Sequence, residues 1–219
     1  MAPVLRSTRP PKHLRLPEFQ HMKSYWDPVQ NIEVVRVLAG EYYVTHCHEM
    51  ITTVLGSCVA ACIRDPVSGI GGMNHFMLPA DKTSRNGPGA VHGLGADAAY
   101  GSYAMERLIN CILKYGGRRD HLEIKLFGGG RIMGGMADIG VQNINFVHAY
   151  LHTDGLSAVV EDVGGSFSRR MAYFPATGKV LVKKLRHIRN ETIIQQENAY
   201  LADLWREAAQ GGEVELFGD

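Results

Sequence analysis

Residues 50–79 read MITTVLGSCVAACIRDPVSGIGGMNHFMLP. Two runs rich in apolar and β-branched residues, 59–63 and 70–78, lie on either side of a turn-forming cluster at 64–69. Two such runs around a turn predict an antiparallel β-hairpin. Residues 50–55 have the same composition and are expected to form a further strand that ends just before the hairpin.

The register of this hairpin brings a cysteine and a histidine together. With the turn centred between Pro66 and Val67, Cys58 lies directly opposite His75. Directly opposed residues on one sheet face have Cβ atoms about 4.5–5.5 Å apart, which lets an imidazole nitrogen reach a thiol. A slip of one residue would place the two side chains on opposite faces of the sheet.

A cysteine beside a histidine suits acyl transfer. A free thiol has a pKa of about 8.5, and a neighbouring histidine can take its proton and later protonate a leaving amine. Gly56 and Ser57 permit a tight turn whose N–H groups, with that of Cys58, face a developing oxyanion. The hydroxyl of Thr52, on the preceding strand, is the candidate group to orient His75. Spacing alone leaves open the alternative of an inert core cysteine and a hydrogen-bonded bystander histidine.

Two other motifs have a weaker chemical interpretation. His46 and His48 flank Cys47 on a predicted strand, an arrangement that can bind a metal, but no second cluster with ligand spacing accompanies them. The run GGGRIMG at 128–134 follows a predicted strand, yet it lacks the glycine spacing and the lysine of a phosphate-binding loop. We therefore expect no metal and no cofactor, and we interpret the glycines as a tight strand-to-helix turn.

The chain is expected to divide into three parts. Residues 1–28 are basic and rich in proline, which predicts a disordered tail, either a contact arm or a solvated extension. Residues 29–188 form the main domain, and 189–219 an amphipathic helix with an acidic tail. We favour packing of that helix on its own domain over binding to a partner, because amphipathic helices usually serve the core.

Strands and helices interleave along the main domain. Apolar periodicity predicts helices over 97–115, 141–152 and 191–209, and residues 80–95 read as a polar, mobile loop. Further strands are expected at 32–38, 42–45, 122–127, 156–160, 168–174 and 179–185. This order predicts an α/β fold, in the broad sense that includes α+β, built from mixed layers.

Composition excludes several classes of protein. The 219 residues carry 23 Lys and Arg against 22 Asp and Glu, a net charge of +1, so nothing calls for a nucleic-acid partner. No apolar run approaches the roughly 18 residues of a membrane span, so no membrane insertion is expected. The N-terminus lacks the apolar stretch of a secretory signal, and four cysteines in this length do not suggest a disulfide framework. We expect a reduced, cytoplasmic, globular protein.

Six segments resemble the CheD family of chemoreceptor glutamine deamidases, in the right order over roughly residues 35–188. They are TTVLGSCVAACIRDP (52–66), GMNHFMLP (72–79), KLFGGG (125–130), IGVQN (139–143), EDVGG (161–165) and TGKVLVK (177–183). The first segment is specific to this family, whereas the glycine pairs alone would not identify it. The resemblance does not extend to the N-terminal tail or to the helix beyond residue 188.

The resemblance implies a cysteine hydrolase, a protein-glutamine glutaminase, that acts on methyl-accepting chemotaxis receptors. It implies Cys58 as nucleophile, His75 as general base and Thr52 as third member, with Thr53 as the substitute if the strand register differs. The implied fold is a layered α/β/β/α arrangement similar to that of deamidating bacterial toxins. Some members of the family also bind a CheC-type phosphatase.

Two other functions compete with receptor deamidation at this level. One is a regulatory binding module that docks to receptors or a phosphatase without using its thiol. The other is a small-molecule amidase, because a loop at 80–95 beside the site would admit a metabolite as well as a protein side chain. Reactivity of Cys58 and the identity of the deamidated substrate discriminate among the three.

Overall fold

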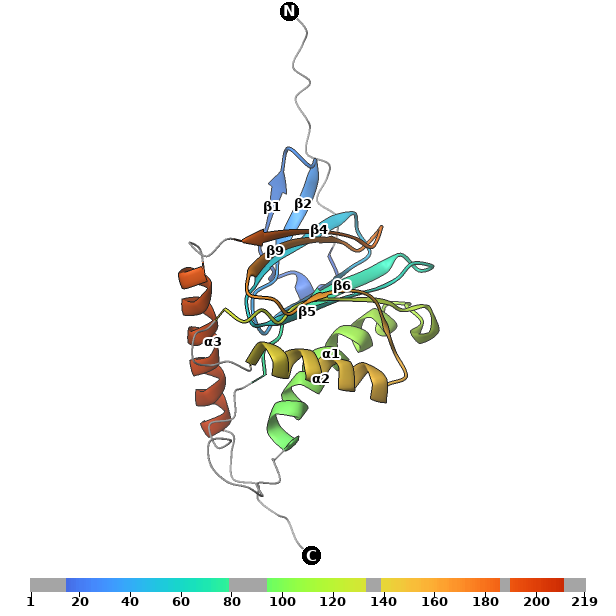
Figure 1. Ribbon diagram of the computed structural model, residues 1–219. Helices are drawn as coiled ribbons and strands as arrows, with labels where there is room; N and C mark the ends of the chain where they lie inside the picture. Colours follow the sequence, from blue (N-terminus) through green and yellow to red (C-terminus); the bar gives the residue numbers. More distant parts are fainter. Residues whose placement is uncertain (1–14, 79–93, 133–138, 186–189, 211–219) are drawn as a thin grey trace, which may run out of the picture.

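In the part of the chain that the structure describes, two five-stranded sheets stack against each other and carry three helices (Figure 1). The computed structural model describes residues 15–78, 94–132, 139–185 and 190–210. The first sheet has the order β1 (Ser24–Asp27), β2 (Ile32–Arg36), β4 (Glu49–Leu55), β9 (Ser168–Phe174), β10 (Lys179–Leu185). The second has the order β3 (Tyr42–Thr45), β6 (Ile70–Asn74), β5 (Val59–Asp65), β7 (Glu123–Gly128), β8 (Ala158–Val163).

The helices lie on one side and at one end of this pair of sheets. Helices α1 (Leu94–Lys114) and α2 (Ile139–Thr153) cover the outer face of the second sheet, while α3 (Asn190–Gln210) stands beside both sheets (Figure 1). Short 3₁₀ turns, η1 (Pro17–Phe19) and η3 (Arg119–His121), complete the described elements. The predicted mixed α+β class is confirmed.

Both sheets mix parallel and antiparallel pairs. β2 runs parallel to β4 and β7 parallel to β8, whereas the other neighbouring strands are antiparallel. Strands β9 and β10 span the residues that composition predicts for them. Helix α1 begins at Leu94, three residues before the predicted start, and α2 begins at Ile139 rather than residue 141.

The hairpin register differs from the prediction by two residues. Cys62 pairs with Met73 and Asp65 with Ile70, and an isolated bridge joins Val59 to Phe76. Cys58 therefore lies across from Met77, not directly opposite His75. The reason is a four-residue turn, because the Asp65 carboxylate accepts hydrogen bonds from the N–H groups of Val67 and Ser68, at 2.7 and 3.2 Å.

The predicted tail boundary is wrong for residues 15–28. Phe19, only 2% exposed, packs edge-on against Tyr42 and Tyr43, and strand β1 pairs with β2. Arg15 is buried as well, and it donates hydrogen bonds to the Met22 carbonyl and the Glu49 carboxylate. The buried apolar side chains Leu16, Phe19 and Met22 lie between the basic residues. Their burial offsets the conformational entropy lost when this segment becomes ordered. Residues 1–14 and 79–93 lie outside the described residues, and with them most of the loop predicted at 80–95, whose last two residues belong to α1.

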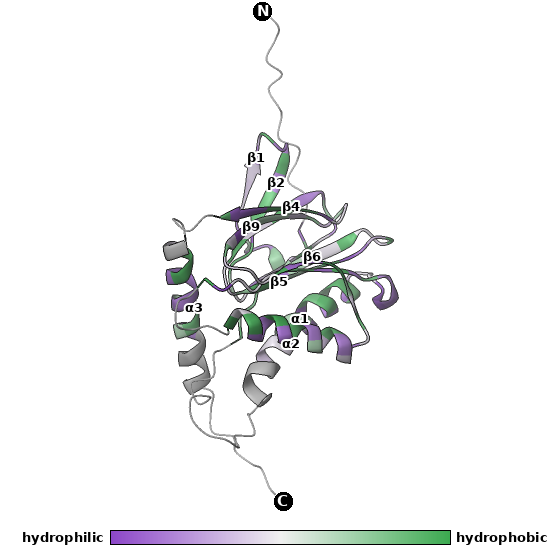
Figure 2. Ribbon diagram, in the orientation of Figure 1, coloured by the Kyte–Doolittle hydropathy of each residue, from purple (hydrophilic) through white to green (hydrophobic). Residues whose placement is uncertain are grey.

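The hydrophobic core fills the space between the sheets and under α1 and α2. Its largest members come from β-branched and aromatic strand positions and from the inward face of α1, which buries Met105, Leu108 and Ile112. Figure 2 shows hydrophobic residues concentrated in these layers, whereas the described part of α3 alternates between hydrophobic and hydrophilic residues. Alternation of this kind is expected of a helix that buries one narrow face.

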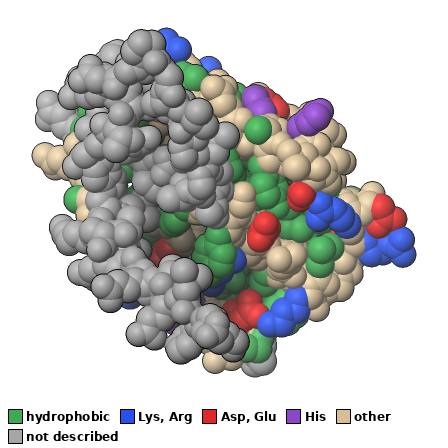
Figure 3. All heavy atoms as spheres, turned by 90° about the horizontal axis from the view of Figure 1, so that it is seen from below, with side chains coloured by type: hydrophobic (Ala, Val, Ile, Leu, Met, Phe, Trp, Pro, Cys, Tyr) green, Lys and Arg blue, Asp and Glu red, His purple; other side chains and the backbone are tan. Residues whose placement is uncertain are grey.

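The surface carries charges of both signs. Arg118 pairs with Asp120, Arg119 with Asp154 and His148 with Glu161. On the face seen in Figure 3, the Lys and Arg side chains likewise lie close to Asp and Glu side chains. Among the described helices, none is both long enough and apolar enough to cross a bilayer.

Candidate functional site

The turn Gly56–Ser57–Cys58 crosses from the first sheet to the second, between β4 and β5, and all three of its carbonyl groups are anchored. The N–H of Gly130 donates to the Gly56 carbonyl and the N–H of Gly129 to the Cys58 carbonyl, both at 2.7 Å. The Asn143 side chain donates to the Ser57 carbonyl at 2.9 Å. Each carbonyl shares a peptide plane with the N–H of the following residue, so the held carbonyls of Gly56 and Ser57 turn the N–H groups of Ser57 and Cys58 to the other side.

Asn143 also connects the cysteine turn to the segment that carries His75. Its amide oxygen accepts a hydrogen bond from the Leu78 N–H at 2.8 Å, and the side chain is fully buried on α2. The glycines 128–130 anchor the same turn, and α2 begins only at Ile139. They do not form the tight strand-to-helix turn that we predict from sequence.

The three N–H groups of the turn converge on the carboxylate of Glu197, which comes from α3. Oε1 accepts from the N–H groups of Gly56 and Cys58, at 3.0 and 3.2 Å. Oε2 accepts from the N–H of Ser57 at 3.1 Å and from its hydroxyl at 2.6 Å. Successive N–H groups that point to one centre form an anion-binding nest, and here the nest is filled by a side chain of the same chain.

Cys58 lies at the base of this nest and has no exposed surface. Its thiol contacts the sulfur of Met77 at 3.7 Å. Burial, followed by the charge of the Glu197 carboxylate and a hydrogen bond to it, raises the pKa of the Cys58 thiol well above its usual range. With Glu197 in place, the thiol is therefore protonated.

His75 follows β6 and is held by both sheets. Its backbone N–H donates to the Glu41 carbonyl at 3.0 Å, and its carbonyl accepts from the Gly40 N–H at 2.7 Å. The ring nitrogen Nδ1 lies 2.8 Å from the hydroxyl oxygen of Thr53, and that hydroxyl donates to the Val37 carbonyl at 2.8 Å. A hydroxyl has one proton, so Thr53 accepts from Nδ1–H and leaves Nε2 with its lone pair.

The lone pair on Nε2 is buried and unused. Nε2 has no hydrogen-bond partner within the described part of the chain, and His75 is only 5% exposed. Burial lowers the pKa of His75 to about 4, against a smaller opposing effect of the Glu197 charge, so the ring is neutral at pH 7. A neutral imidazole with a free lone pair is the form that accepts a proton.

Thr52, the residue predicted to orient His75, does not contact it. Side chains alternate along β4, so Thr53 points inward to His75 while Thr52 is half-buried on the other face of the strand. The backbone of Thr52 serves the first sheet instead, where it lies between Arg36 of β2 and Ala172 of β9. The structure thus brings Cys58, His75 and Thr53 to one end of the two sheets.

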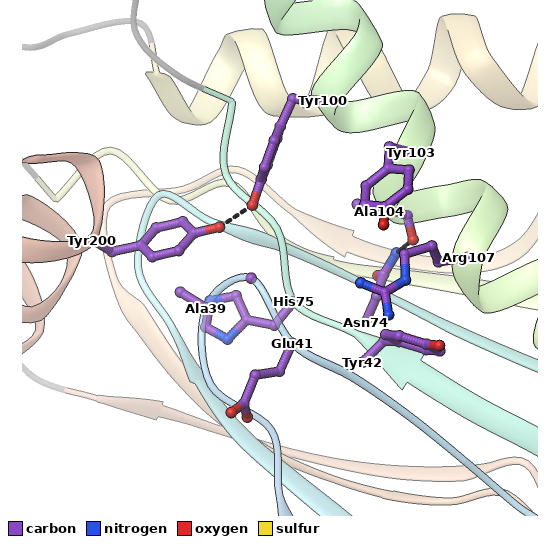
Figure 4. Close-up of a pocket in the computed structure, with 11 residues that line it drawn as sticks. Ala39, Glu41, Tyr42, Asn74, His75, Tyr100, Tyr103, Ala104, Arg107 and Tyr200 are labelled. Atoms are coloured by element: carbon purple, nitrogen blue, oxygen red, sulfur yellow. Dashed lines mark hydrogen bonds between the residues drawn. The ribbon is translucent and has the colours of Figure 1, made fainter. Parts of the chain in front are cut away.

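Two cavities meet at His75 and Tyr200. The first, of about 360 Å³, lies under α1, where Arg107 stacks over Tyr42 and Tyr103 with its guanidinium carbon 4.7 and 5.2 Å from the ring centres (Figure 4). The second, of about 350 Å³, lies between α3 and the edge formed by β2 and β4, and Thr53 and Glu197 line it. The hydroxyl groups of Tyr100 and Tyr200 hydrogen-bond across the first cavity (Figure 4).

The site comes from five separate parts of the chain, and sequence reasoning finds only some of them. Glu197 and Asn143 are missed: the first lies 139 residues from Cys58, and the second 86 residues from Ser57. Asn143 falls within one of the segments of family resemblance, which is the signal that would have drawn attention to it. Glu197 lies outside all of those segments.

These features define a two-sheet α+β protein with a buried cysteine, a proton-accepting histidine and an anion nest at one end of the sheets. The family model described as CheD chemotactic sensory transduction matches residues 77–184. A protein from Halorhodospira halophila named "Probable chemoreceptor glutamine deamidase CheD" is 46% identical over 205 residues, covering 92% of this chain and 93% of its own. The chain therefore belongs to the CheD family.

Two further relatives carry the same name. The protein from Hahella chejuensis is 46% identical over 207 residues, which cover 94% of this chain and 96% of its own. The protein from Methylobacillus flagellatus is 48% identical over 195 residues, which cover 88% and 94%. The similarity to each relative thus spans most of both chains, whereas the family model ends at residue 184, before α3.

Substitution of Gly128 by alanine tests the anchoring of the cysteine turn. Gly128 has a φ of +110°, and an added Cβ would lie 2.2 Å from the Cys58 carbonyl oxygen. Gly116 is the matched control, with a φ of +101° and nothing within 4 Å of its Cβ position. In urea denaturation we expect Gly116→Ala to cost about 1–3 kcal/mol of unfolding free energy. We expect Gly128→Ala to cost more, and equal costs would contradict the close approach.

The lowered pKa of His75 predicts an acid-sensitive contribution to stability. The pKa is about 4 in the folded protein against about 6.5 in the unfolded chain, so the unfolded state binds the proton first as the pH falls. The unfolding free energy is therefore highest above pH 6.5. It decreases as the pH falls to 4, by on the order of 3 kcal/mol in total. Between pH 6.5 and pH 4 the unfolding free energy of wild type should fall by about 3 kcal/mol more than that of His75→Gln, which has no group that titrates there. A constant difference would contradict the neutral, buried histidine.

Proposed function

We propose that this protein hydrolyses glutamine side chains of methyl-accepting chemotaxis receptors to glutamates, with Cys58 as nucleophile. The observation that carries the proposal is the nest of three N–H groups at Gly56, Ser57 and the buried Cys58, whose occupant Glu197 lines one cavity with His75, an imidazole with a free lone pair. Such a nest stabilises the oxyanion that forms when a nucleophile attacks a carboxamide carbon. Receptor glutamine as the substrate is taken from the printed names of the relatives.

In the proposed reaction, His75 moves protons and Thr53 orients it. Nε2 takes the proton of the Cys58 thiol as Sγ adds to the carboxamide carbon, and the carbonyl oxygen enters the nest. The imidazolium then protonates the amide nitrogen, which leaves as ammonia, and a thioester remains. Water, which gives a proton to Nε2, hydrolyses the thioester to a carboxylate and the free thiol. Thr53 holds Nδ1–H throughout and thereby keeps Nε2 directed at the reacting atoms.

The substrate's location suggests where this protein acts. Receptor signalling regions lie in the cytoplasm in the family that this chain resembles, and a reactive thiol requires a reduced compartment. We propose a cytoplasmic location on those grounds. A CheC-type phosphatase is a further proposed partner, which the family resemblance alone supports.

Removal of the Cys58 thiol should abolish the proposed activity. A recombinant receptor signalling domain is incubated with wild type or Cys58→Ala, and receptor peptides are analysed by mass spectrometry. We expect site-specific conversion of amide to acid with wild type and none with Cys58→Ala, because no other described group near the nest is a nucleophile of comparable strength. Conversion by Cys58→Ala would exclude the proposed nucleophile. Receptor binding without conversion by wild type would favour a regulatory binding module instead.

The two neighbouring threonines form a matched pair for the orienting role. Thr53→Val removes the hydroxyl at Nδ1 of His75 while nearly keeping the volume, and Thr52→Val makes the same change on the other face of β4. We expect Thr53→Val to lower the turnover number for receptor deamidation about 10- to 100-fold, with a shifted pH profile. Thr52→Val should stay near the wild-type rate. A larger loss for Thr52→Val would reassign the orienting role to Thr52.

A further inference from the structure

The carboxylate of Glu197 occupies the place where a reaction product would sit. It is the same chemical group that deamidation of a glutamine side chain creates. It accepts three backbone N–H bonds and one hydroxyl bond at the cysteine turn, and it is only 4% exposed. It bonds the Cys58 N–H and lines one cavity together with His75 and Thr53, so it lies beside the groups that carry out the proposed chemistry.

Helix α3 presents Glu197 on a narrow inward face. Over residues 192–203, whose side chains the structure describes, the buried positions are Ile193, Glu197 and Leu201. These positions are four residues apart and therefore lie in one row along the helix. Among these described positions Glu197 is the buried polar side chain, and its hydrogen bonds attach the helix to the cysteine turn.

Tyr200 gives the helix one more specific contact beside the site. Its hydroxyl bonds that of Tyr100 on α1, and its ring packs so closely on Gly40 that an added Cβ there would lie 2.7 Å from the hydroxyl oxygen. Gly40 in turn donates its N–H to the His75 carbonyl. The helix is thus positioned against both the nest and the histidine segment.

We propose that α3 is an internal occupant of the substrate site, with Glu197 as a built-in product mimic that inhibits the enzyme until α3 is displaced. The inhibitory effect rests on the proposed deamidation. The occupancy of the nest by the Glu197 carboxylate rests on the hydrogen bonds of the structure alone. A side chain that fills the nest and covers the thiol prevents a receptor glutamine from reaching Cys58. Removal of Glu197 then increases both the accessibility of the thiol and the rate on receptors.

The proposal has a chemical consequence that a purely structural role lacks. In a Glu197→Gln variant, the carboxamide carbon lies where Cys58 can attack it. Addition of Sγ forms a carbon–sulfur bond, protonation by His75 releases ammonia, and water hydrolyses the thioester to the carboxylate. The variant therefore converts itself, within one chain, to the wild-type protein with net uptake of water and loss of ammonia.

Thiol reactivity tests the occupancy without a receptor. Wild type, Glu197→Ala and Asn198→Ala are treated with iodoacetamide, and alkylation of each cysteine is followed by mass spectrometry. We expect Cys58 to react about tenfold faster or more in Glu197→Ala, a typical size for a coupling between two sites. Asn198 is exposed on the same helix, so its variant should match wild type. Cys62, 1% exposed in the core, reports unfolding, and its protection shows that the fold is intact.

The Glu197→Gln variant tests the placement of the side chain, and its near-isosteric change preserves the fold. Purified variant is incubated over a range of concentrations, and the peptide that contains position 197 is analysed for amide-to-acid conversion. We expect conversion at a rate independent of protein concentration, and none when Cys58→Ala is added to the variant. Gln195 and Gln196 in the same peptide are internal controls that should keep their amides. Conversion that depends on concentration, or no conversion when wild type does deamidate receptors, would overturn the proposal.

Receptor assays separate this proposal from the proposed function. Glu197→Ala should deamidate receptors about tenfold faster than wild type, whereas a slower rate would make Glu197 a positioning residue and overturn the inhibitory role. If no variant converts receptors but Cys58 labelling still accelerates in Glu197→Ala, receptor deamidation fails and the occupancy stands. If wild type converts receptors but neither labelling nor self-conversion responds to position 197, the occupancy fails and receptor deamidation stands.

Discussion

The anchoring of three consecutive carbonyl groups at Gly56, Ser57 and Cys58 is the constraint on which the site depends. Two of the anchors are N–H groups of the glycine run after β7, and the third is the Asn143 side chain on α2. A peptide plane whose oxygen is held points its N–H the opposite way, so the held carbonyls of Gly56 and Ser57 fix the N–H groups of Ser57 and Cys58. Two of the three nest donors are therefore oriented before any anion enters, and preorganised donors lose little free energy to reorganisation when charge appears there.

The same constraint explains why the fold needs two sheets. Thr53 belongs to the first sheet and His75 follows a strand of the second, and the cysteine turn is the link that crosses between them. Asn143 bonds both the turn and Leu78, so the thiol and the histidine segment share one anchor. Removal of a single buried anchor would leave polar groups unsatisfied at two places in the site, which is costly in a buried environment.

Local patterns predicted the strands well and the long-range geometry poorly. The sequence located β9 and β10 residue for residue, because the turn residues at 175–178 separate two segments that contain β-branched and aromatic residues. The hairpin register was missed by two, since the Asp65 side chain stabilises a longer turn than the Pro66–Val67 pair suggests. The choice between Thr52 and Thr53 depends on which face of β4 is inward, and Glu197 reaches the nest from 139 residues away. No periodicity in a single sequence carries those two facts.

Glu197 also bears on how the site treats its own product. Burial of a carboxylate is costly unless hydrogen bonds replace its water, and the nest supplies four. A nest that stabilises an oxyanion thus also binds a carboxylate, so the product of the proposed reaction is a natural inhibitor. A carboxylate on a tethered helix competes at an effective concentration in the millimolar range, far above that of a diffusing protein. A receptor segment that displaces α3 must therefore bind through contacts outside the nest, where α3 buries only two apolar side chains among its described positions.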